Sequence, residues 1–177
     1  MTTRPEAART TVILVDDDPL IVDAIQFTLA DEFAVLAAAS RAQARTLLQS
    51  LDKPPALALI DLGLPPTPHS PEEGFGLIAE LLAHRHAMKI LVLSGQSDRD
   101  NVQRALSLGA VDFLPKPCDA DLLRARLRHQ LMILEAESSS RPLTRQVTEI
   151  LIGDSPEMQT LRALIKQFAN SPFPVLI

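Results

Sequence analysis

The sequence predicts an α/β domain with a doubly wound, five-stranded parallel sheet, and two observations support this fold class. Five short apolar runs lack polar alternation, which is typical of strands buried on both faces. Segments with the period of amphipathic helices separate these runs. Strand and helix therefore alternate over residues 11–135, and we expect the strand order 2-1-3-4-5.

Each predicted element has its own local signal. The strands correspond to the apolar runs at 12–15, 33–36, 57–60, 90–93 and 111–114. Residues that favour helix starts stand before each helical segment: Asp18 with Pro19, Ser40 with Gln43, Ser70 with Pro71, Ser97 with Asp98, and Asp119. Gly109 is placed to end the fourth helix.

Composition excludes several classes of protein. The chain has 177 residues, 46% of them hydrophobic, and a formal net charge of −5, which argues against a general nucleic-acid-binding surface. No apolar run approaches the roughly 20 residues that a membrane span needs, so we expect no membrane partner. Cys118 is the single cysteine and cannot form an internal disulfide. We therefore expect a cytoplasmic protein.

The residues beyond the predicted domain divide into three further parts. Residues 1–10 are expected to be a disordered N-terminus. Residues 136–150 lose the apolar pattern and are interpreted as a linker. Residues 151–177 contain one amphipathic helix and a strand-like end, which are too few elements to enclose a core. This last part, a helical C-terminal extension, is either the truncated start of a second domain or a tail that packs on something else.

The predicted strands are followed by residues that can carry chemistry. These residues are Asp16, Asp17, Asp18, Asp61, Ser94 and Lys116. Ligands of doubly wound sheets bind at the carboxyl ends of the strands, where the first and third strands are neighbours. Asp16, Asp17 and Asp61 should therefore lie together. Clustered carboxylates repel one another unless a hard cation binds between them, and oxygen ligands suit Mg²⁺.

Two other kinds of site are disfavoured. The first strand–helix turn has no glycine-rich phosphate loop, so a dinucleotide site is rejected. Cys118 has no histidine base placed by this topology, which argues against thiol catalysis. The Asp triplet at 16–18 also has a purely structural interpretation as a helix cap.

Four motifs resemble the receiver domain of bacterial two-component response regulators. They are Val-Asp-Asp-Asp-Pro at 15–19, Ile-Asp-Leu-Gly-Leu-Pro at 60–65, Val-Leu-Ser-Gly-Gln at 92–96 and Asp-Phe-Leu-Pro-Lys-Pro at 112–117. The resemblance implies a flavodoxin-like fold and a phosphorylation-dependent regulator of transcription rather than an enzyme. It implies that Asp61 accepts a phosphoryl group from a sensor histidine kinase. Asp16, Asp17, Asp61 and the backbone carbonyl of Gly63 would bind Mg²⁺.

The resemblance also assigns a switch and a positive charge. Ser94 would be the switch hydroxyl, Phe113 the switch aromatic and Lys116 the residue that pairs with the phosphoryl group. It further implies a cis peptide bond between Lys116 and Pro117.

One loop departs from the family pattern. Ten residues, three of them proline, separate Pro65 from Gly76, an excess of about seven residues that forms a proline-rich insertion at 65–72. The acidic residues of the site are unaffected by this insertion.

The end of the chain carries a second resemblance. Leu-Ile-Gly-Asp-Ser-Pro-Glu-Met-Gln at 151–159 and Phe-Pro-Val-Leu-Ile at 173–177 resemble the opening of the AAA+ domain in nitrogen-regulatory (NtrC-type) activators of sigma-54. No phosphate loop is present, so the chain as given should not hydrolyse ATP. DNA and sigma-54 RNA polymerase would be partners only through domains absent from this chain.

Two alternative functions and one oligomeric state are further hypotheses. Asp16 and Asp18 are spaced as in an aspartyl phosphatase of the haloacid-dehalogenase type, although that motif gives Asp61 no role. A non-phosphorylated scaffold with the receiver fold is the other alternative. A homodimer is expected through the helix that starts near Asp119. Its apolar stripe consists of Leu123, Leu127, Leu131 and Leu134, with Leu122 and Ile133 beside it.

Overall fold

The computed structural model describes residues 9–67, 70–95 and 99–139, in which five strands and five helices alternate. The strands are β1 (Thr10–Val15), β2 (Phe33–Ala38), β3 (Leu57–Asp61), β4 (Lys89–Ser94) and β5 (Asp112–Pro115). The helices are α1 (Pro19–Leu29), α2 (Arg41–Gln49), α3 (Glu72–His84), α4 (Arg99–Ser107) and α5 (Ala120–Ser139). Each predicted strand is confirmed, with ends that shift by a few residues. β1 begins at Thr10, within the range assigned to the N-terminal segment.

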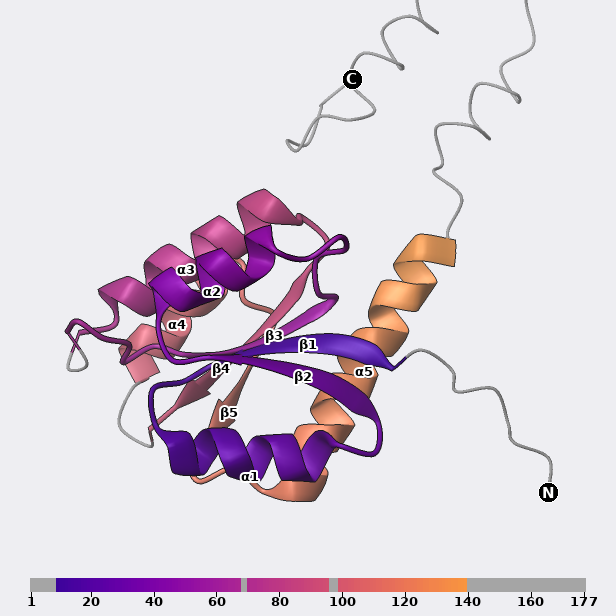
Figure 1. Ribbon diagram of the computed structural model, residues 1–177, viewed down its shortest axis with the longest axis horizontal. Helices are drawn as coiled ribbons and strands as arrows, with labels where there is room; N and C mark the ends of the chain where they lie inside the picture. The colour runs from indigo at the N-terminus through magenta and orange to yellow at the C-terminus, as the bar shows by residue number, and fades with distance from the viewer. Residues whose placement is uncertain (1–8, 68–69, 96–98, 140–177) are drawn as a thin grey trace, which may run out of the picture. The chain divides into compact units, whose positions relative to one another are not determined.

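The sheet is parallel throughout and has the order β2-β1-β3-β4-β5. The predicted fold class and strand order are therefore confirmed. In Figure 1, α1 and α5 cover one face of the sheet, and α2, α3 and α4 cover the other. The sequence-distant β1 and β3 are neighbours in this order, which brings together the segments that follow them.

The apolar runs lack alternation because both faces of the sheet are covered. Ile13 and Ile60 belong to the core cluster beneath α2, α3 and α4. Their neighbours Leu14 and Leu59 belong to the cluster beneath α1 and α5. All four side chains are fully buried. Burial of a large apolar side chain contributes about 1.5–3 kcal/mol, so this continuous pattern favours strands covered on both faces.

Most predicted helix signals act as expected. The Asp18 side chain accepts the Leu20 N–H and caps α1, and the Ser40 side chain accepts the Gln43 N–H at the start of α2. Gly109, with φ of 110°, follows the end of α4. At α3 the capping position is Pro71, which makes no side-chain cap hydrogen bond. The expected signal at Ser97 and Asp98 lies outside the described residues.

The loop between β3 and α3 differs in one respect from the sequence interpretation, which measured the insertion to Gly76. A Cβ atom on Gly74 would lie 2.6 Å from the Leu62 Cα, so this glycine is the one that permits close backbone packing. A Cβ on Gly76 would meet only the end of the Arg41 side chain. Gly74, two residues before Gly76, is therefore the glycine of α3 that the packing of this loop requires. Leu62 and Leu64 are buried and anchor the start of the loop.

The chain divides into two compact units, Met1–Leu134 and Glu135–Ile177. Of the second unit the structure describes only Glu135–Ser139, the end of α5. α5 continues through residues 136–139, so the first part of the predicted linker at 136–150 is helical. The rest of this linker and the predicted AAA+ segment at 151–177 lie outside the described residues. Within the described part of the chain, no helix has the length and apolar content required to cross a membrane.

Candidate functional site

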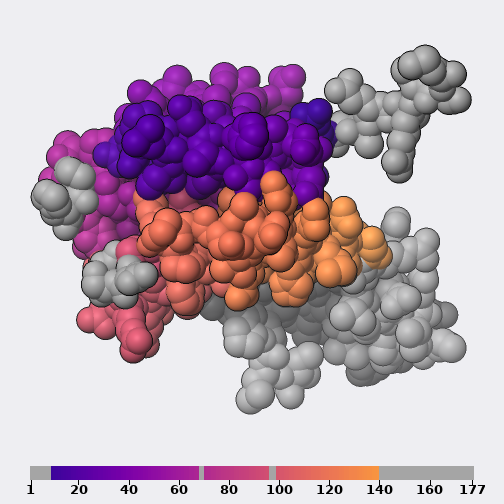
Figure 2. Space-filling model, turned by 90° about the horizontal axis from the view of Figure 1, so that it is seen from below, coloured from indigo at the N-terminus to yellow at the C-terminus, as the bar shows by residue number. Residues whose placement is uncertain are grey.

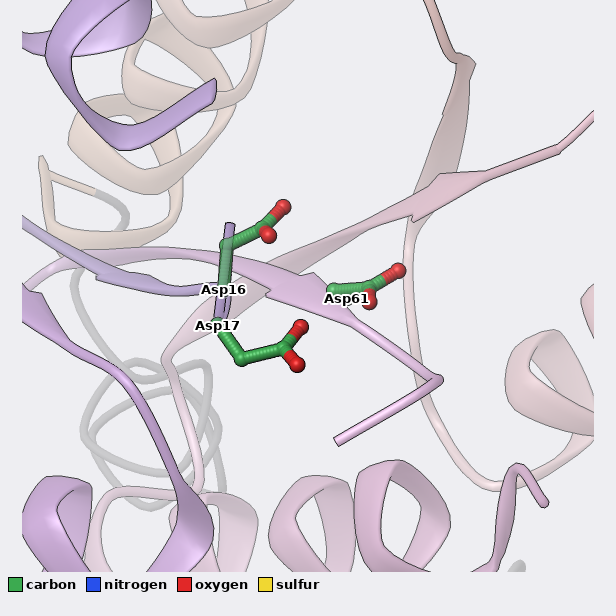
Figure 3. A group of neighbouring side chains, drawn as sticks. All are labelled: Asp16, Asp17 and Asp61. Atoms are coloured by element: carbon green, nitrogen blue, oxygen red, sulfur yellow. The ribbon is translucent and has the colours of Figure 1, made fainter. Parts of the chain in front are cut away.

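The carboxyl ends of β1 and β3 bring three carboxylates together. Val15 pairs with Ile60, so the residues that follow, Asp16 and Asp61, lie at the same edge of the sheet. Ligand atoms of Asp16, Asp17 and Asp61 all lie within 4.8 Å of one another. Figure 3 shows Asp16 and Asp17 on one stretch of backbone and Asp61 opposite them, with the carboxylates directed to the same side. The predicted acidic cluster is therefore present.

Asp16 is held from two sides. Its side chain is only 1% exposed, and its Oδ1 accepts the backbone N–H of Asp18 at 3.0 Å. Its Oδ2 lies 2.6 Å from Nζ of Lys116, an ion pair whose angle falls outside hydrogen-bond geometry. Asp18 thus does more than cap α1, because its backbone also orients a site carboxylate. The sequence analysis missed this contact, since a backbone N–H gives no side-chain signal.

Lys116 joins the cluster from the end of β5. Its Nζ lies 3.0 Å from Asp61 Oδ1, and its side chain is 20% exposed. The Lys116 backbone N–H donates to the carbonyl of Ser94 at 2.7 Å, which fixes the start of the following loop. The peptide bond between Lys116 and Pro117 is cis, as the resemblance implied. One ammonium group therefore faces two of the three carboxylates.

Burial and charge set the protonation of this cluster. Burial raises the pKa of Asp61, and the Lys116 ammonium offsets this only in part, while the negative charges of Asp16 and Asp17 raise it further. Burial alone would lower the pKa of Lys116. Its ion pairs with Asp16 and Asp61 outweigh burial, so the pKa of Lys116 is raised. Lys116 is consequently charged when it faces the carboxylates.

The donor set fits a hard divalent cation. Carboxylate oxygens are the ligands that Mg²⁺ prefers, and Mg²⁺ keeps several waters, which a partly open site permits. Asp16 is buried, Asp61 is intermediate and Asp17 is exposed, so the cluster opens on one side. Gly63 lies half-buried, two residues after Asp61. The arrangement is compatible with a Mg²⁺ site.

Ser94 lies farther along the same edge, and Phe113 lies within β5 beside Val92 of β4. Ser94 ends β4 and is 5% exposed, whereas Phe113 on β5 is 45% exposed. Both line a groove of about 500 Å³ that α4 borders through Val102 and Leu106. The two residues that the resemblance links as a switch therefore share one groove.

A second groove was not predicted. It has a volume of about 490 Å³ and lies between α1 and the segment after β5. Leu20, which is 77% exposed, and Ala24 line it from α1, and Lys116 and Cys118 line it from the other side. Burial raises the pKa of the Cys118 thiol, with a contribution from Asp119, which disfavours the thiolate. In the sequence, Leu20 was indistinguishable from a core residue of an amphipathic helix.

Comparison with known proteins agrees with this geometry. A family model described as the response regulator receiver domain matches residues 12–128. The chain belongs to this family. Among its relatives, the receiver domain is similar to the response regulator protein PilR of Pseudomonas aeruginosa. The two are 31% identical over 173 residues, which cover 96% of this chain and 36% of PilR.

Two further similarities extend past the receiver domain. The alginate biosynthesis transcriptional regulatory protein AlgB of Pseudomonas putida is 30% identical over 172 residues, which cover 94% of this chain and 36% of AlgB. The crystal structure of NtrX from Brucella abortus in complex with ADP matches with a TM-score of 0.67 and 25% identity. That match covers 92% of this chain and 35% of the NtrX chain. The chain thus spans about a third of the length of these relatives.

Family membership decides between the alternatives from the sequence. The haloacid-dehalogenase alternative relied on Asp16 and Asp18 and gave Asp61 no role. The family match overrules it, and the structure places Asp61 beside Asp16 and Lys116. Asp18 instead caps α1. The receiver family is one of regulators, and its relatives here carry names of transcriptional regulatory proteins.

Proposed function

We propose that this receiver domain accepts a phosphoryl group on Asp61 from a phosphohistidine of a sensor histidine kinase. The observation that carries the proposal is the contact of Lys116 Nζ with Asp16 at 2.6 Å and Asp61 at 3.0 Å, beside the exposed carboxylate of Asp17. A positive charge next to a partly open carboxylate suits transfer of an anionic group.

The transfer is a displacement at phosphorus. An Asp61 carboxylate oxygen attacks the phosphorus atom, a P–O bond forms and the P–N bond to the kinase imidazole breaks. The imidazole nitrogen keeps the electron pair and takes up a proton from water. Asp61 must be ionised to attack, and the Lys116 ammonium favours that form against burial. The product is an acyl phosphate on Asp61.

Lys116 and the acidic residues would have different roles in neutralising the charge of the transferring phosphoryl group. Lys116 would pair with the oxygens of the transferring group, since its Nζ already lies within 3.0 Å of Asp61. Asp16, Asp17, Asp61 and the backbone carbonyl of Gly63 would hold Mg²⁺. When bound, this ion would supply positive charge to the transferring phosphoryl oxygens. Asp18 keeps Asp16 in position through its backbone N–H.

The output of the domain is proposed to be control of transcription. The Ser94 hydroxyl would donate to the new phosphoryl group, and Phe113 would turn toward the shared groove. We propose a cytoplasmic homodimer whose full-length form continues into an ATPase domain. In this proposal the chain as given ends before the phosphate loop. Its similarity to NtrX, which was solved with ADP, supports the proposal. DNA and sigma-54 RNA polymerase would then be contacted by those further domains.

Intact-mass measurement tests the proposal. The chain treated with acetyl phosphate and Mg²⁺ should gain the mass of one phosphoryl group, and Asp61→Asn should gain none. Asp17→Ala should retain Asp61 but slow the labelling at least about tenfold, because one metal ligand is missing. The parent in excess chelator is the matched control and should label as slowly as Asp17→Ala. Undiminished labelling of Asp61→Asn would overturn the assignment, and no labelling of the parent would favour the scaffold alternative.

A further inference from the structure

α4 rests on the sheet through few residues and has free space on one side. Its buried side chains are Val102 and Ala105, so it buries two residues, as α1 and α2 do, whereas α3 buries five. The groove of about 500 Å³ lies along α4 on the side of β5. Ser94 lines the same groove and ends the strand next to the one that carries Asp61. α4 therefore has room to shift at the place where the proposed phosphoryl group would act.

One side chain of α4 points away from this groove and contacts α3. Arg104 donates from Nη1 to Glu72 Oε1 at 3.0 Å. The guanidinium carbon also lies 4.5 Å from the centroid of the Phe75 ring. Phe75 is 4% exposed and belongs to the core, so the ring gives Arg104 a fixed surface to stack on. Arg104 thus connects a lightly packed helix to the interior of the domain.

The first turn of α3 provides both partners, and it directly follows the proline-rich insertion. The Glu72 N–H donates to the Ser70 hydroxyl oxygen at 3.5 Å, and the Phe75 N–H donates to the Pro71 carbonyl at 2.9 Å. The described end of the insertion therefore leads straight into the turn that presents Glu72 and Phe75.

We propose that the first turn of α3 holds α4 in its unphosphorylated position through Arg104 and thereby limits how readily Asp61 is phosphorylated. The regulatory part rests on the proposed function of Asp61. A contact that favours one arrangement of α4 opposes any modification that favours the other arrangement. If the phosphoryl group draws Ser94 and α4 together across the groove, the Arg104 contacts must lengthen or break. Their loss should therefore make phosphorylation easier.

The two contacts of Arg104, with Glu72 and with Phe75, contribute differently to holding α4. The Arg104 and Glu72 side chains are 57% and 61% exposed, and ion pairs between exposed groups stabilise little. Stacking of a guanidinium on a buried ring adds to this, and a lysine cannot make both contacts in the same way. Arg104→Lys should therefore keep part of the effect, and Arg104→Ala should lose all of it.

Hydrogen exchange without a phosphodonor tests the structural part of the proposal. In the 177-residue chain, Arg104→Ala should speed amide exchange across α4 by about threefold to tenfold and leave the exchange of α1 unchanged. Arg45→Ala is the matched control, because it removes another exposed ion pair, Arg45 with Glu80 at 2.7 Å, from α2 and α3. It should leave the exchange of α4 as in the parent. Equal acceleration in every helix, or no acceleration in α4, would overturn the proposal.

A second pair of measurements tests the coupling and the regulation. Glu72→Ala should speed α4 exchange when Arg104 is present and have a much smaller effect in Arg104→Ala, whereas additive effects would contradict the contact. With acetyl phosphate and Mg²⁺, Arg104→Ala should label at Asp61 about twofold to tenfold faster than the parent and Arg45→Ala. Equal labelling rates would overturn the regulatory part. A parent that takes up no phosphoryl group would instead contradict the function of Asp61, and the exchange result would stand by itself.

Discussion

Burial and neighbouring negative charges oppose ionisation of the Asp61 carboxylate, and its pKa is raised although Lys116 lies 3.0 Å away. An acid with a higher pKa in the folded state stabilises that state at low pH. This contribution is lost as the pH rises through the raised pKa. At neutral pH the Asp61 charge therefore destabilises the domain. This loss of stability accompanies the proposed function, because the nucleophile that it requires is an ionised Asp61.

Asp61→Asn should consequently stabilise the domain at neutral pH when no divalent cation is present. We expect a gain of about 1 kcal/mol, or about 2–4 °C in melting temperature, because one buried negative charge disappears. The gain should shrink as the pH falls through the raised pKa of Asp61, since the parent is then neutral at this residue too. Thermal melts with chelator at several pH values check this. Asp23→Asn, an exposed carboxylate on α1, is the control and should change the melting temperature little.

At the level of elements, two glycines at the start of α3 fit against different neighbours. A Cβ on Gly74 would lie 2.6 Å from Leu62 Cα and 2.9 Å from the Leu62 carbonyl oxygen, both of which are backbone atoms. A Cβ on Gly76 would lie 2.3 Å from Arg41 Nη1, at the end of a flexible side chain. The first neighbour cannot move without shifting the loop after β3, but the second can rotate away.

Gly74→Ala should therefore destabilise the domain by about 2–3 kcal/mol, because the loop that follows Asp61 must move. Gly76→Ala should change the free energy of unfolding by less than about 1 kcal/mol. Alanine favours the helix there, while Arg41 loses part of its contact with Glu80. Urea unfolding of the two variants measures the difference. Equal losses in both variants would contradict the distinction between backbone and side-chain neighbours.

The elements that sequence could predict are those with local or periodic signals. The unbroken run 57–60 identified a strand covered on both faces, and Asp18 before Pro19 identified the start of α1. Strand order then placed Asp16 beside Asp61, because parallel strands share their carboxyl ends. The role of Gly74 and the contact of Arg104 with Phe75 could not be predicted. Both depend on distances between segments that are far apart in the sequence. No local sequence pattern indicates such distances.

At the level of the whole molecule, α5 has two faces. The sequence predicts that this helix forms a core face as well as a dimer contact, and Leu123 and Leu127 of its leucine stripe are buried in the domain core. Figure 2 shows α5, in orange, lying along the indigo N-terminal part of the domain, where Arg124 Nε donates to the Thr28 carbonyl at 3.1 Å. The leucine stripe therefore packs into the core of the domain.

Two apolar residues of α5 that remain accessible lie on another line, and Met132, which is 62% exposed, lies off that line. Leu122 is 37% exposed and Ile133 is partly exposed, and their spacing of three helical turns puts them on one side of the helix. Phe113 on β5 is 45% exposed, and Val111, just before this strand, is 39% exposed. Such apolar groups on neighbouring elements suit an interface better than isolated exposed residues do. We expect the proposed homodimer to use this side of α5, and not the leucine stripe.

Sedimentation of surface variants separates the two faces without removing part of the core. Leu122→Glu combined with Ile133→Glu should weaken self-association of the 177-residue chain about tenfold or more, because two charges would have to be buried in the contact. Phe27→Glu is the matched control, since Phe27 is 87% exposed on α1 and its replacement adds the same charge outside the interface. It should leave self-association unchanged. If the double variant and Phe27→Glu associate as strongly as the parent, or if the parent is a monomer at high micromolar concentration, this side of α5 does not form a dimer.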